Sequence, residues 1–479
     1  MPYEPVIGLE IHVQLNTQSK IFCACPADSW GALPNTNICP VCTGQPGTLP
    51  VLNRAVVEKA VLLAAAVHCV EIQPESFFDR KNYFYPDLPK GYQITQYDQP
   101  IGRQGWFDVP LPDSATRRVS IHKMHMEEDA GKTKNDPLRG LRLIDMNRCG
   151  VPLVEMVTGP DLRSADEAAA FLGRLRQLLR WLDVSEANME RAHLRCDANV
   201  SIREAGSTVL NPKTEIKNVN SIEAVRDAIE VEIQRQTREV GAGRRVEAWT
   251  LEWDEDTQSL KKMRSKETEA DYRYFREPDL LSLRLDPAWR DDLLQRLPEL
   301  PLDRYARFIT QYRLPVYDAT ILTEERSLSD YFEEAARLFG GEPKVIANWV
   351  QNEVLRLLKE SNQAAGQLAF SPAHLAELAR LVEDKTITRQ TAVAVIPKVV
   401  ATGQGPKAIV AAEGLAQISG DDAVRELARQ VVAESPTEAA SYSAKPSLLK
   451  WFVGQVMRKS KGQANAQTAE RLLKEILEG

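Results

Sequence analysis

Within the run Val6–Leu15, apolar side chains alternate strictly from Ile7 onward with Gly8, Glu10, His12 and Gln14, and this pattern constrains the fold more than any other in the chain. Successive side chains of a β-strand point to opposite faces, so the pattern predicts a strand with Glu10 and His12 as neighbours on its polar face. A carboxylate beside an imidazole can hold a hard cation or move a proton. We therefore expect a sheet with one buried face and one polar face that is a candidate for chemistry. The apolar set is Ile7, Leu9, Ile11, Val13 and Leu15.

Four cysteines follow this strand at the spacing CxC-x13-CxxC, namely Cys23, Cys25, Cys39 and Cys42. Two close thiolate pairs joined by a short loop are typical of a tetrahedral zinc site. Because all four ligands are thiolates, no coordination position is left open for a substrate. The pattern predicts a structural zinc site and not a catalytic one.

The chain has 479 residues, more than one hydrophobic core usually supports, so we expect two to three domains. Before about residue 295 the sequence carries short β-like runs, and these are interrupted by helices, of which one begins at a capping box of Ser164 and Glu167. The order is irregular, which favours an α+β domain with a mostly antiparallel sheet over a doubly wound α/β fold. The strand candidates lie near 6–15, 117–124, 151–157, 196–203 and 212–219.

Helical periodicity takes over after residue 295. Ser371 followed by Pro372 predicts a helix start, and Gly403 and Gly405 mark a break within a segment, 401–420, that we interpret as a hinge with a short helix. We expect three domains at 1–295, 296–402 and 403–479, and the second and third of these to be all-α.

Composition and charge fit a soluble globular protein, with 43% hydrophobic and 27% charged residues and a formal net charge of −7. An acidic protein of this kind does not bind nucleic acid indiscriminately, but the last 39 residues carry seven Lys or Arg against three Glu, which predicts a locally basic tail. No apolar run is long enough to cross a bilayer, and residues 1–4 lack the features of a signal peptide. With the cysteines read as thiols or zinc ligands, we expect a cytoplasmic protein.

Two further runs alternate in the same way as the first. Residues 196–203 place Asp197, Asn199, Ser201 and Arg203 on one face, and residues 213–217 align Lys213, Glu215 and Lys217. A solvated face of an antiparallel sheet also gives this alternation. The combination of acids, amides, basic side chains and one His on three strands favours a functional surface over a merely solvated one.

The run from His125 to Thr133 contains three consecutive acids, Glu127, Glu128 and Asp129, before Gly131 and Lys132. It fits either a solvated turn or a site that binds Mg²⁺ through oxygen ligands. The first glycine that a P-loop needs is replaced by Met126, so we reject that motif.

A stretch from Phe78 to Gln93 mixes aromatic side chains with Arg80, Lys81 and Asn82, and a similar stretch covers 264–275. Such aromatic clusters belong to a core or an interface, or they form a pocket for a phosphate or a nucleotide 3′ end.

Several of these segments resemble the B subunit of aspartyl/glutamyl-tRNA amidotransferases. The similar segments run in order across nearly the whole chain and include VIGLEIHVQL, CPVCTGQPGTLPVLN, FDRKNYFYPDLPKGYQITQ, HMEEDAGK, NRCGVPLVEMVTGPDLRS, LRCDANVSIR, EIKNVNSIEAVRDAIEVEIQRQ and the C-terminal FVGQVMRKSKGQANAQ.

The resemblance implies a cradle-shaped N-terminal domain followed by a helical domain and a tail that grip tRNA. It implies that the protein uses ATP and Mg²⁺ to phosphorylate the side-chain carboxylate of Glu on tRNA-Gln or Asp on tRNA-Asn. It further implies a heterotrimer, in which a partner amidase (glutaminase) supplies ammonia from glutamine and a small third partner joins the two.

By this resemblance Glu10, His12, Glu128 and Asp197 match positions of the metal centre, and Glu155 is a further candidate for Mg²⁺. Phosphorylating a carboxylate brings negative charges together, which cations must offset. We predict that Lys81, Arg195 and Lys217 contact the phosphates or the acyl phosphate.

Two alternatives fit the same sequence features. A Glu/His/Asp centre with a zinc knuckle also suits a metal-dependent hydrolase, which turns over substrate without a nucleotide. A non-catalytic, zinc-containing RNA-binding protein fits the basic tail, and it would have no chemistry to lose when acids are replaced.

Overall fold

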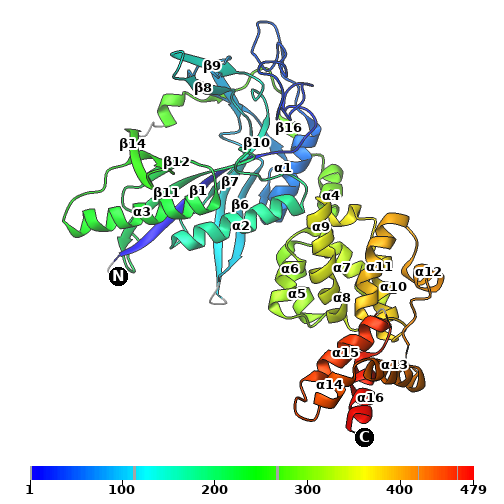
Figure 1. Cartoon of the computed structure of the whole chain (residues 1–479). Helices are drawn as coiled ribbons and strands as arrows, with labels where there is room; N and C mark the ends of the chain where they lie inside the picture. The colour runs from blue at the N-terminus through cyan, green and yellow to red at the C-terminus, as the bar shows by residue number, and fades with distance from the viewer. Residues whose placement is uncertain (1–2, 112–114, 266–268, 419, 461, 479) are drawn as a thin grey trace. The chain divides into compact units, whose positions relative to one another are not determined.

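The computed structural model describes residues 3–111, 115–265, 269–418, 420–460 and 462–478. The chain forms two compact units, Met1–Leu300 and Pro301–Gly479, and each is described here by itself (Figure 1).

The strands of the first unit form one large sheet and three small ones. The order in the large sheet is β14-β13-β12-β11-β1-β10-β7-β6-β2, with antiparallel pairing throughout except between β12 and β13. Its strands are β1 (Tyr3–Gln14), β2 (Glu71–Ile72), β6 (Gly102–Pro110), β7 (Thr116–Glu128), β10 (Pro152–Thr158), β11 (Leu194–Glu204), β12 (Thr214–Val219), β13 (Trp249–Asp254) and β14 (Ser259–Ser265). The small sheets combine β4 (Asp79–Asn82), β5 (Tyr92–Thr95) and β15 (Phe275–Arg276); β3 (Glu75–Ser76) and β16 (Leu283–Arg284); and β8 (Lys132–Asp136) and β9 (Leu141–Asp145).

The alternation in β1 divides its side chains between the two faces of the sheet. Ile7, Leu9, Ile11 and Val13 are fully buried, whereas Glu10 and His12 are half-buried on the other face. The apolar face packs against α2 (Ala165–Trp181) and α3 (Ile222–Gly241), which lie side by side in Figure 1. The α-helices α1 (Arg54–Ala66) and α4 (Pro287–Gln295) also belong to the described part of this unit. The opposite, polar face of the sheet is therefore the one that is available for a functional site.

The predicted start of α2 at Ser164 is confirmed, but the Glu167 side chain bonds to the backbone one residue earlier than in a capping box. Ser164 is the N-cap, and its hydroxyl accepts a hydrogen bond from the backbone N–H of Glu167. The Glu167 carboxylate accepts from the backbone N–H of Arg163, one residue before the cap, and also pairs with Arg117 on β7. The acid thus ties the helix start to the sheet.

The second unit is all-helical. Its helices are α5 (Pro301–Thr310), α6 (Val316–Leu322), α7 (Arg326–Phe339), α8 (Pro343–Trp349), α9 (Leu355–Ser361), α10 (Pro372–Glu383), α11 (Arg389–Thr402), α12 (Pro406–Ala412), α13 (Asp421–Glu434), α14 (Pro436–Ser441), α15 (Leu448–Lys459) and α16 (Ala466–Glu478). Their buried apolar side chains form two clusters, one within residues 308–410 and one within 424–473. The division of the chain into three domains stays a prediction.

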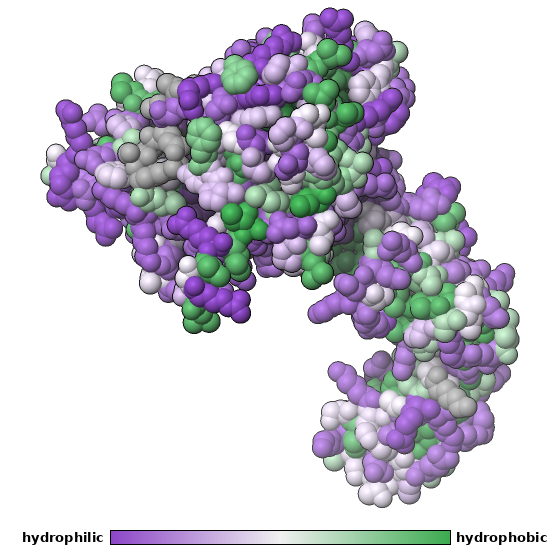
Figure 2. All heavy atoms as spheres, turned by 90° about the horizontal axis from the view of Figure 1, so that it is seen from above, coloured by the Kyte–Doolittle hydropathy of each residue, from purple (hydrophilic) through white to green (hydrophobic). Residues whose placement is uncertain are grey.

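The predicted fold class is confirmed, since a mixed, mostly antiparallel sheet with helices precedes an all-helical region. Within the described part of the chain, no helix is both long enough and apolar enough to span a membrane. The face seen in Figure 2 is mostly hydrophilic, and its apolar residues lie in small separate groups.

A buried polar network joins α3 to the sheet. Glu232 is fully buried, and its carboxylate accepts hydrogen bonds from Thr214 on β12 at 2.6 Å and from Gln236 at 2.7 Å. Arg235 pairs with the same carboxylate at 2.7 Å, and the Gln236 amide also donates to the carbonyl of Val200 on β11. Because the Glu232 carboxylate accepts from three side chains at once, removing it takes away more interactions than removing any one of its partners.

We expect Glu232→Ala to destabilise the first unit by about 3 kcal/mol, because it removes the buried carboxylate that accepts hydrogen bonds from Thr214 and Gln236 and pairs with Arg235. Calorimetry of the full chain would report this as a lower melting temperature. Glu230→Ala, at an exposed position on the same helix, is the matched control and should change stability by less than about 0.5 kcal/mol. Equal effects of the two substitutions would contradict the network's role.

Candidate active site and metal centres

A cavity of about 550 Å³ lies over the polar face of the large sheet. Strands β1, β7, β10, β11 and β12 form its floor, and the small sheet of β4 and β5 together with the segment 272–274 forms its walls. The predicted site residues that line it are Glu10, His12, Lys81, Glu155, Arg195, Asp197 and Lys217.

Strand register brings two imidazoles and two carboxylates together in this cavity. His12 on β1 lies opposite Glu155 on β10, which in turn lies opposite His125 on β7, and Glu127 follows two residues later on the same face. The Nε2 atom of His12 is 3.3 Å from Glu155 and 3.4 Å from Glu127. The Nε2 atom of His125 is 3.4 Å from Glu155 and 3.6 Å from Glu127. We call these four residues the His/Glu cluster.

Burial and mutual attraction shift the pKa values in the His/Glu cluster. Burial disfavours the charged form of His125, but the opposing charge of Glu155 and hydrogen bonds to both carboxylates raise its pKa to about 9. The pKa of His12 is raised against burial by its hydrogen bond to Glu155 and by the charges of both carboxylates. The two imidazoles hold the pKa values of Glu127 and Glu155 below their ordinary range, against the effect of burial. The ionised carboxylates of Glu127 and Glu155 therefore need positive charge close to them.

A second group of charged residues surrounds Glu10, two residues before His12 on β1. Glu10 is opposite Asp197 on β11, and its carboxylate accepts a hydrogen bond from Asn199 at 2.9 Å. The Nζ atom of Lys217 is 2.6 Å from Asp197 and 3.4 Å from Glu215. Burial opposes the charge of this lysine, but the surrounding carboxylates raise its pKa, so it stays cationic.

Arg195 forms the third group. It lies opposite His12 in the β1–β11 ladder, and its guanidinium is 2.8 Å from the buried carboxylate of Asp129. Arg148 approaches the same carboxylate at 3.5 Å. Asp129 therefore holds both guanidinium groups at the wall of the cavity.

Aromatic side chains surround Lys81 on the opposite wall. Its Nζ atom lies 4.7 Å from the ring centre of Tyr272 and 6.0 Å from that of Tyr83. Tyr97 and Tyr274 stack at 4.0 Å in the same wall. The two predicted aromatic stretches thus meet here. Lys266 and Glu267 of the second stretch lie outside the described residues.

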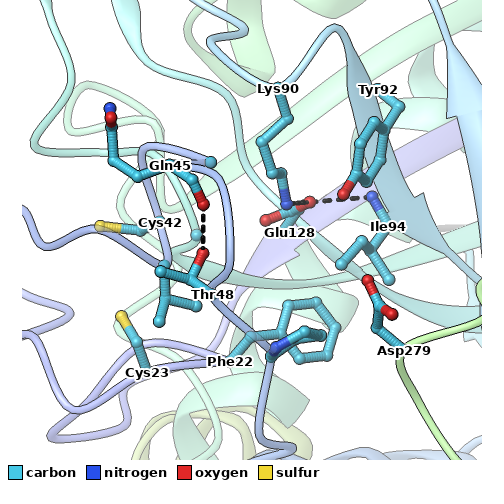
Figure 3. Close-up of a pocket in the computed structure, with 14 residues that line it drawn as sticks. Phe22, Cys23, Cys42, Gln45, Thr48, Lys90, Tyr92, Ile94, Glu128 and Asp279 are labelled. Carbon is cyan, nitrogen blue, oxygen red and sulfur yellow. Dashed lines mark hydrogen bonds and ion pairs between the residues drawn. The ribbon is translucent and has the colours of Figure 1, made fainter.

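The structure does not bring Glu128 to the other predicted acids. It ends β7 on the opposite side of the strand from Glu127, where it forms an ion pair with Lys90 and accepts a hydrogen bond from the backbone N–H of Ile94 at 2.9 Å (Figure 3). It lines a separate small cavity of about 70 Å³ beside Cys23 and Cys42. The physical reason is the period of two along a strand, which puts neighbouring residues on opposite faces.

The four cysteines Cys23, Cys25, Cys39 and Cys42 converge, with their Sγ atoms all within 4.8 Å of one another. A tetrahedral zinc ion with Zn–S bonds of ~2.3 Å needs Sγ atoms about 3.8 Å apart. The Sγ atoms of Cys39 and Cys42 are 3.8 Å apart, so the spacing fits zinc.

The surroundings of Cys42 favour a thiolate. Hydrogen bonding from Cys23, helped by the backbone N–H of Cys39 and the charge of Lys20, lowers its pKa to about 4. Lys20 is fully buried, and its Nζ atom lies 3.6 Å from the Cys42 Sγ atom and 2.7 Å from the carbonyl of Asn37. A buried ammonium group needs such negative partners.

The His/Glu cluster also fits a cation. Three members of the cluster, His12, Glu127 and Glu155, have potential ligand atoms that all lie within 4.8 Å of one another. Among the described residues, the four cysteines form the other group that meets this criterion. One imidazole with two carboxylates suits a divalent ion, which would offset the two buried negative charges. Glu10 and Asp197 line the same cavity but lie outside this group of three.

Several charged residues of the cavity were not among the predicted site residues, among them Glu127, His125, Asp129 and Glu215. Glu127 and His125 belong to the acid-rich run 125–133. The alternation of side chains along a strand is the sequence signal that would have identified these two as residues of the polar face. The predicted strand near 117–124 continues to Glu128, and extending its alternation by four residues puts His125 and Glu127 on the polar face. No sequence signal pairs Asp129 with Arg195, since the two are 66 residues apart.

Comparison with known proteins agrees with the geometry. Residues 5–291 match the family model of the GatB/GatE catalytic domain, and residues 330–477 match that of the GatB domain. Proteins named as the B subunit of aspartyl/glutamyl-tRNA(Asn/Gln) amidotransferase are similar over the whole chain. That of Thermodesulfovibrio yellowstonii is 47% identical over 100% of both chains, that of Geotalea daltonii 46% over 100% of both, and that of Brevibacillus brevis 44% over 99% of both. The chain therefore belongs to the GatB family of tRNA-dependent amidotransferase subunits.

Proposed function

We propose that this chain uses ATP to activate the side-chain carboxylate of Glu or Asp misattached to tRNA, so that ammonia can convert it to an amide. The observation that carries the proposal is the cavity itself. It combines the His/Glu cluster with the cations Lys81, Arg195 and Lys217 on one polar sheet face. A site for phosphoryl transfer needs both a place for a divalent cation and fixed positive charges around the phosphates.

The reaction has two balanced steps. A carboxylate oxygen of the aminoacyl group attacks the γ-phosphorus of ATP, and the bond to the β,γ-bridging oxygen breaks, which releases ADP and leaves an acyl phosphate. Ammonia then attacks the acyl carbon, the carbon–oxygen bond to phosphate breaks, and inorganic phosphate leaves carrying the proton that the nitrogen loses. The product is the amide on the same tRNA.

The residues of the chain have distinct roles in this proposal. His12, Glu127 and Glu155 would hold Mg²⁺, which when bound draws negative charge away from the phosphates. Arg195 and Lys217 stay cationic, because Asp129 and Asp197 hold them in place, and they stabilise charge on the transferred phosphoryl group.

Lys81 acts from the opposite wall of the cavity, among the tyrosines. Its position there suits contact with the terminal nucleotide or with ATP.

We expect Glu127→Gln to lower tRNA-dependent ATP consumption by on the order of 100-fold, because it removes a charged ligand from the His/Glu cluster. The same variant should need a higher Mg²⁺ concentration for half-maximal activity and should bind Mn²⁺ more weakly in calorimetric titration. Affinity for misacylated tRNA should remain within about twofold of wild type.

Glu128→Gln is the matched control, one residue away with the same loss of charge. Its Mg²⁺ requirement and Mn²⁺ affinity should equal those of wild type, because its carboxylate faces Lys90 and Ile94. A raised Mg²⁺ requirement in Glu128→Gln but not in Glu127→Gln would refute the assignment.

We further propose that zinc occupies the four-cysteine site as a structural ion. Cys39→Ser should reduce bound zinc from about one per chain to near zero and lower the melting temperature of the first unit, because zinc binding contributes to folding. Elemental analysis and calorimetry measure these two effects. Cys69→Ser, outside the cluster, should retain the zinc. Full zinc retention in Cys39→Ser would contradict the proposal.

The proposed function also involves partner proteins. The names of the relatives describe one component of a larger enzyme, and we propose a heterotrimer with an amidase, which supplies ammonia from glutamine, and a small third protein.

We also propose that the protein is cytoplasmic. Cysteines that are all free fit a reducing compartment such as the cytoplasm.

One assay separates the proposed function from its two alternatives. A metal-dependent hydrolase would act without ATP, and a non-catalytic RNA-binding protein would not consume it. The purified complex, supplied with glutamine and Mg-ATP, should instead convert Glu-tRNA-Gln to Gln-tRNA.

We also propose that the C-terminal tail binds tRNA through exposed cations. Lys445, Lys450, Arg458 and Lys474 are exposed, whereas Lys459 pairs with Glu434 and Arg471 with Asp421 and Glu475. Lys461 lies outside the described residues. Deletion of the tail after Ser441 would remove α15 and α16 from the core that they share with α13, so charge substitutions test the proposal more cleanly.

The double substitution Lys445→Ala, Lys450→Ala should weaken tRNA binding and reduce the slope of log affinity against log salt by about two, because two phosphate contacts are lost. Titration by fluorescence anisotropy at several salt concentrations measures both. Lys459→Ala is the control and should have a smaller effect, since Glu434 already neutralises that lysine. An unchanged salt slope in the double variant would exclude these contacts.

A further inference from the structure

A second cavity, of about 510 Å³, lies where β1 ends, apart from the catalytic residues. Four segments line it: the end of β1 and the residues after it, the residues Ala27 and Asp28, the exposed side of α2, and the loop before β11. Both β1 and α2 can be followed in Figure 1. None of the residues assigned above to catalysis or to a metal lines this cavity.

The cavity is rich in arginine. Arg176 and Arg180 project from α2, Arg191 comes from the loop before β11, and the acids on the lining are Asp28 and Glu186. In the described part of the chain, neither Arg176 nor Arg191 forms an ion pair with an acid of the protein. Guanidinium groups without such partners are suited to bind a phosphate or a carboxylate from another molecule.

An exposed aromatic ring lies at the edge of this cavity. The guanidinium of Arg191 is 4.6 Å from the ring centre of Trp30, whose surface remains 63% exposed. The arginine fixes one face of the indole and leaves the ring accessible to another planar group. Stacking on an aromatic ring beside cations is a common way of binding unpaired nucleotides.

The lining also contains polar atoms that the protein does not satisfy. The Nδ1 atom of His193 and the Oδ1 atom of Asn16 are buried, and neither has a hydrogen-bond partner among the residues that the structure describes. Buried polar atoms usually have partners, so unpaired ones call for an explanation. In the loop that carries His193, Ala187 and Ala192 adopt left-handed backbone conformations, with φ of 48° and 58°. Such conformations are unfavourable for alanine and mark a loop that its surroundings hold in place.

The cavity continues the line of the catalytic strands. The backbone N–H of Gln14 donates to the carbonyl of His193, one step beyond the last pair of the β1–β11 ladder. Gln14 and His193 lie two residues past His12 and Arg195, which places them roughly 7 Å further along the strands. A polynucleotide whose end reaches the catalytic cavity can therefore pass this point.

We propose that this second cavity binds a backbone phosphate of the tRNA, with an unpaired base stacked on Trp30. Arg176 and Arg191 contact the phosphate, and His193 and Asn16 complete the polar lining. The inference rests on the proposed function, since it assigns a further contact to the same substrate. The exposed indole beside Arg191 favours a nucleotide over an acidic peptide, which would use the guanidinium groups alone.

The test compares single variants in the complex as purified, with a tRNA-Gln transcript as the probe. Arg176→Ala and Arg191→Ala should each weaken binding about tenfold and lower the salt slope by about one. Trp30→Ala should weaken binding about fivefold or more with little change in slope, because stacking involves no counterion release. With misacylated tRNA the KM should rise in all three variants while kcat stays unchanged.

Arg226→Ala is the matched control, since this exposed arginine of α3 lines neither cavity, and it should behave as wild type. Wild-type affinity and slope in both arginine variants would overturn the inference. Loss of a copurifying partner protein with unchanged tRNA affinity would also overturn it and assign the cavity to that partner. If the wild-type complex fails to amidate the tRNA, the proposed function fails; if it succeeds and the variants match it, only this inference fails.

Discussion

The register of β1 between β10 and β11 is the constraint on which the catalytic cavity depends. It places His12 beside Glu155 on one side and beside Arg195 on the other, and it sets Glu10 opposite Asp197. A shift of one residue would turn all of these side chains into the apolar core and expose Ile11 and Val13. The apolar face of β1, packed against α2 and α3, therefore also determines which side chains line the cavity.

Charge compensation explains how so many ionisable groups share one concave surface. Asp129 is matched by Arg195, and Asp197 by Lys217, so those pairs bring little net charge. The His/Glu cluster differs, because its two carboxylates pair with imidazoles and not with a Lys or Arg among the described residues. A divalent cation would complete it. The fixed cations beside it line the same cavity, where by our proposal they would stabilise the charge of a transferred phosphoryl group.

The four-cysteine site stands next to this arrangement and follows the same physical rule. A fully buried lysine, Lys20, faces the Cys42 sulfur, and the neighbouring small cavity contains the ion pair of Lys90 with Glu128. Burial of each charge is again tolerated because an opposite charge is close. The cysteine cluster lies in the segment that follows β1, and the second cavity, with its arginines, lies at the same end of the strand.

Local patterns in the sequence determined much of this protein. Strict alternation defines β1 and β11, the cysteine spacing defines the thiolate cluster, and Ser164 defines the start of α2, because each depends on residues close together in the chain. Other features depend on partners distant in the chain. Glu127 and not Glu128 lines the large cavity because β7 extends through both and alternates between faces, and Asp129, just after β7, meets Arg195 on β11 although the two are 66 residues apart. The second cavity has no sequence signature, since its lining comes from four separate segments. The sequence by itself thus determined which side chains a strand presents, and the tertiary structure decided which of them meet, because only long-range pairing sets the distance between charges.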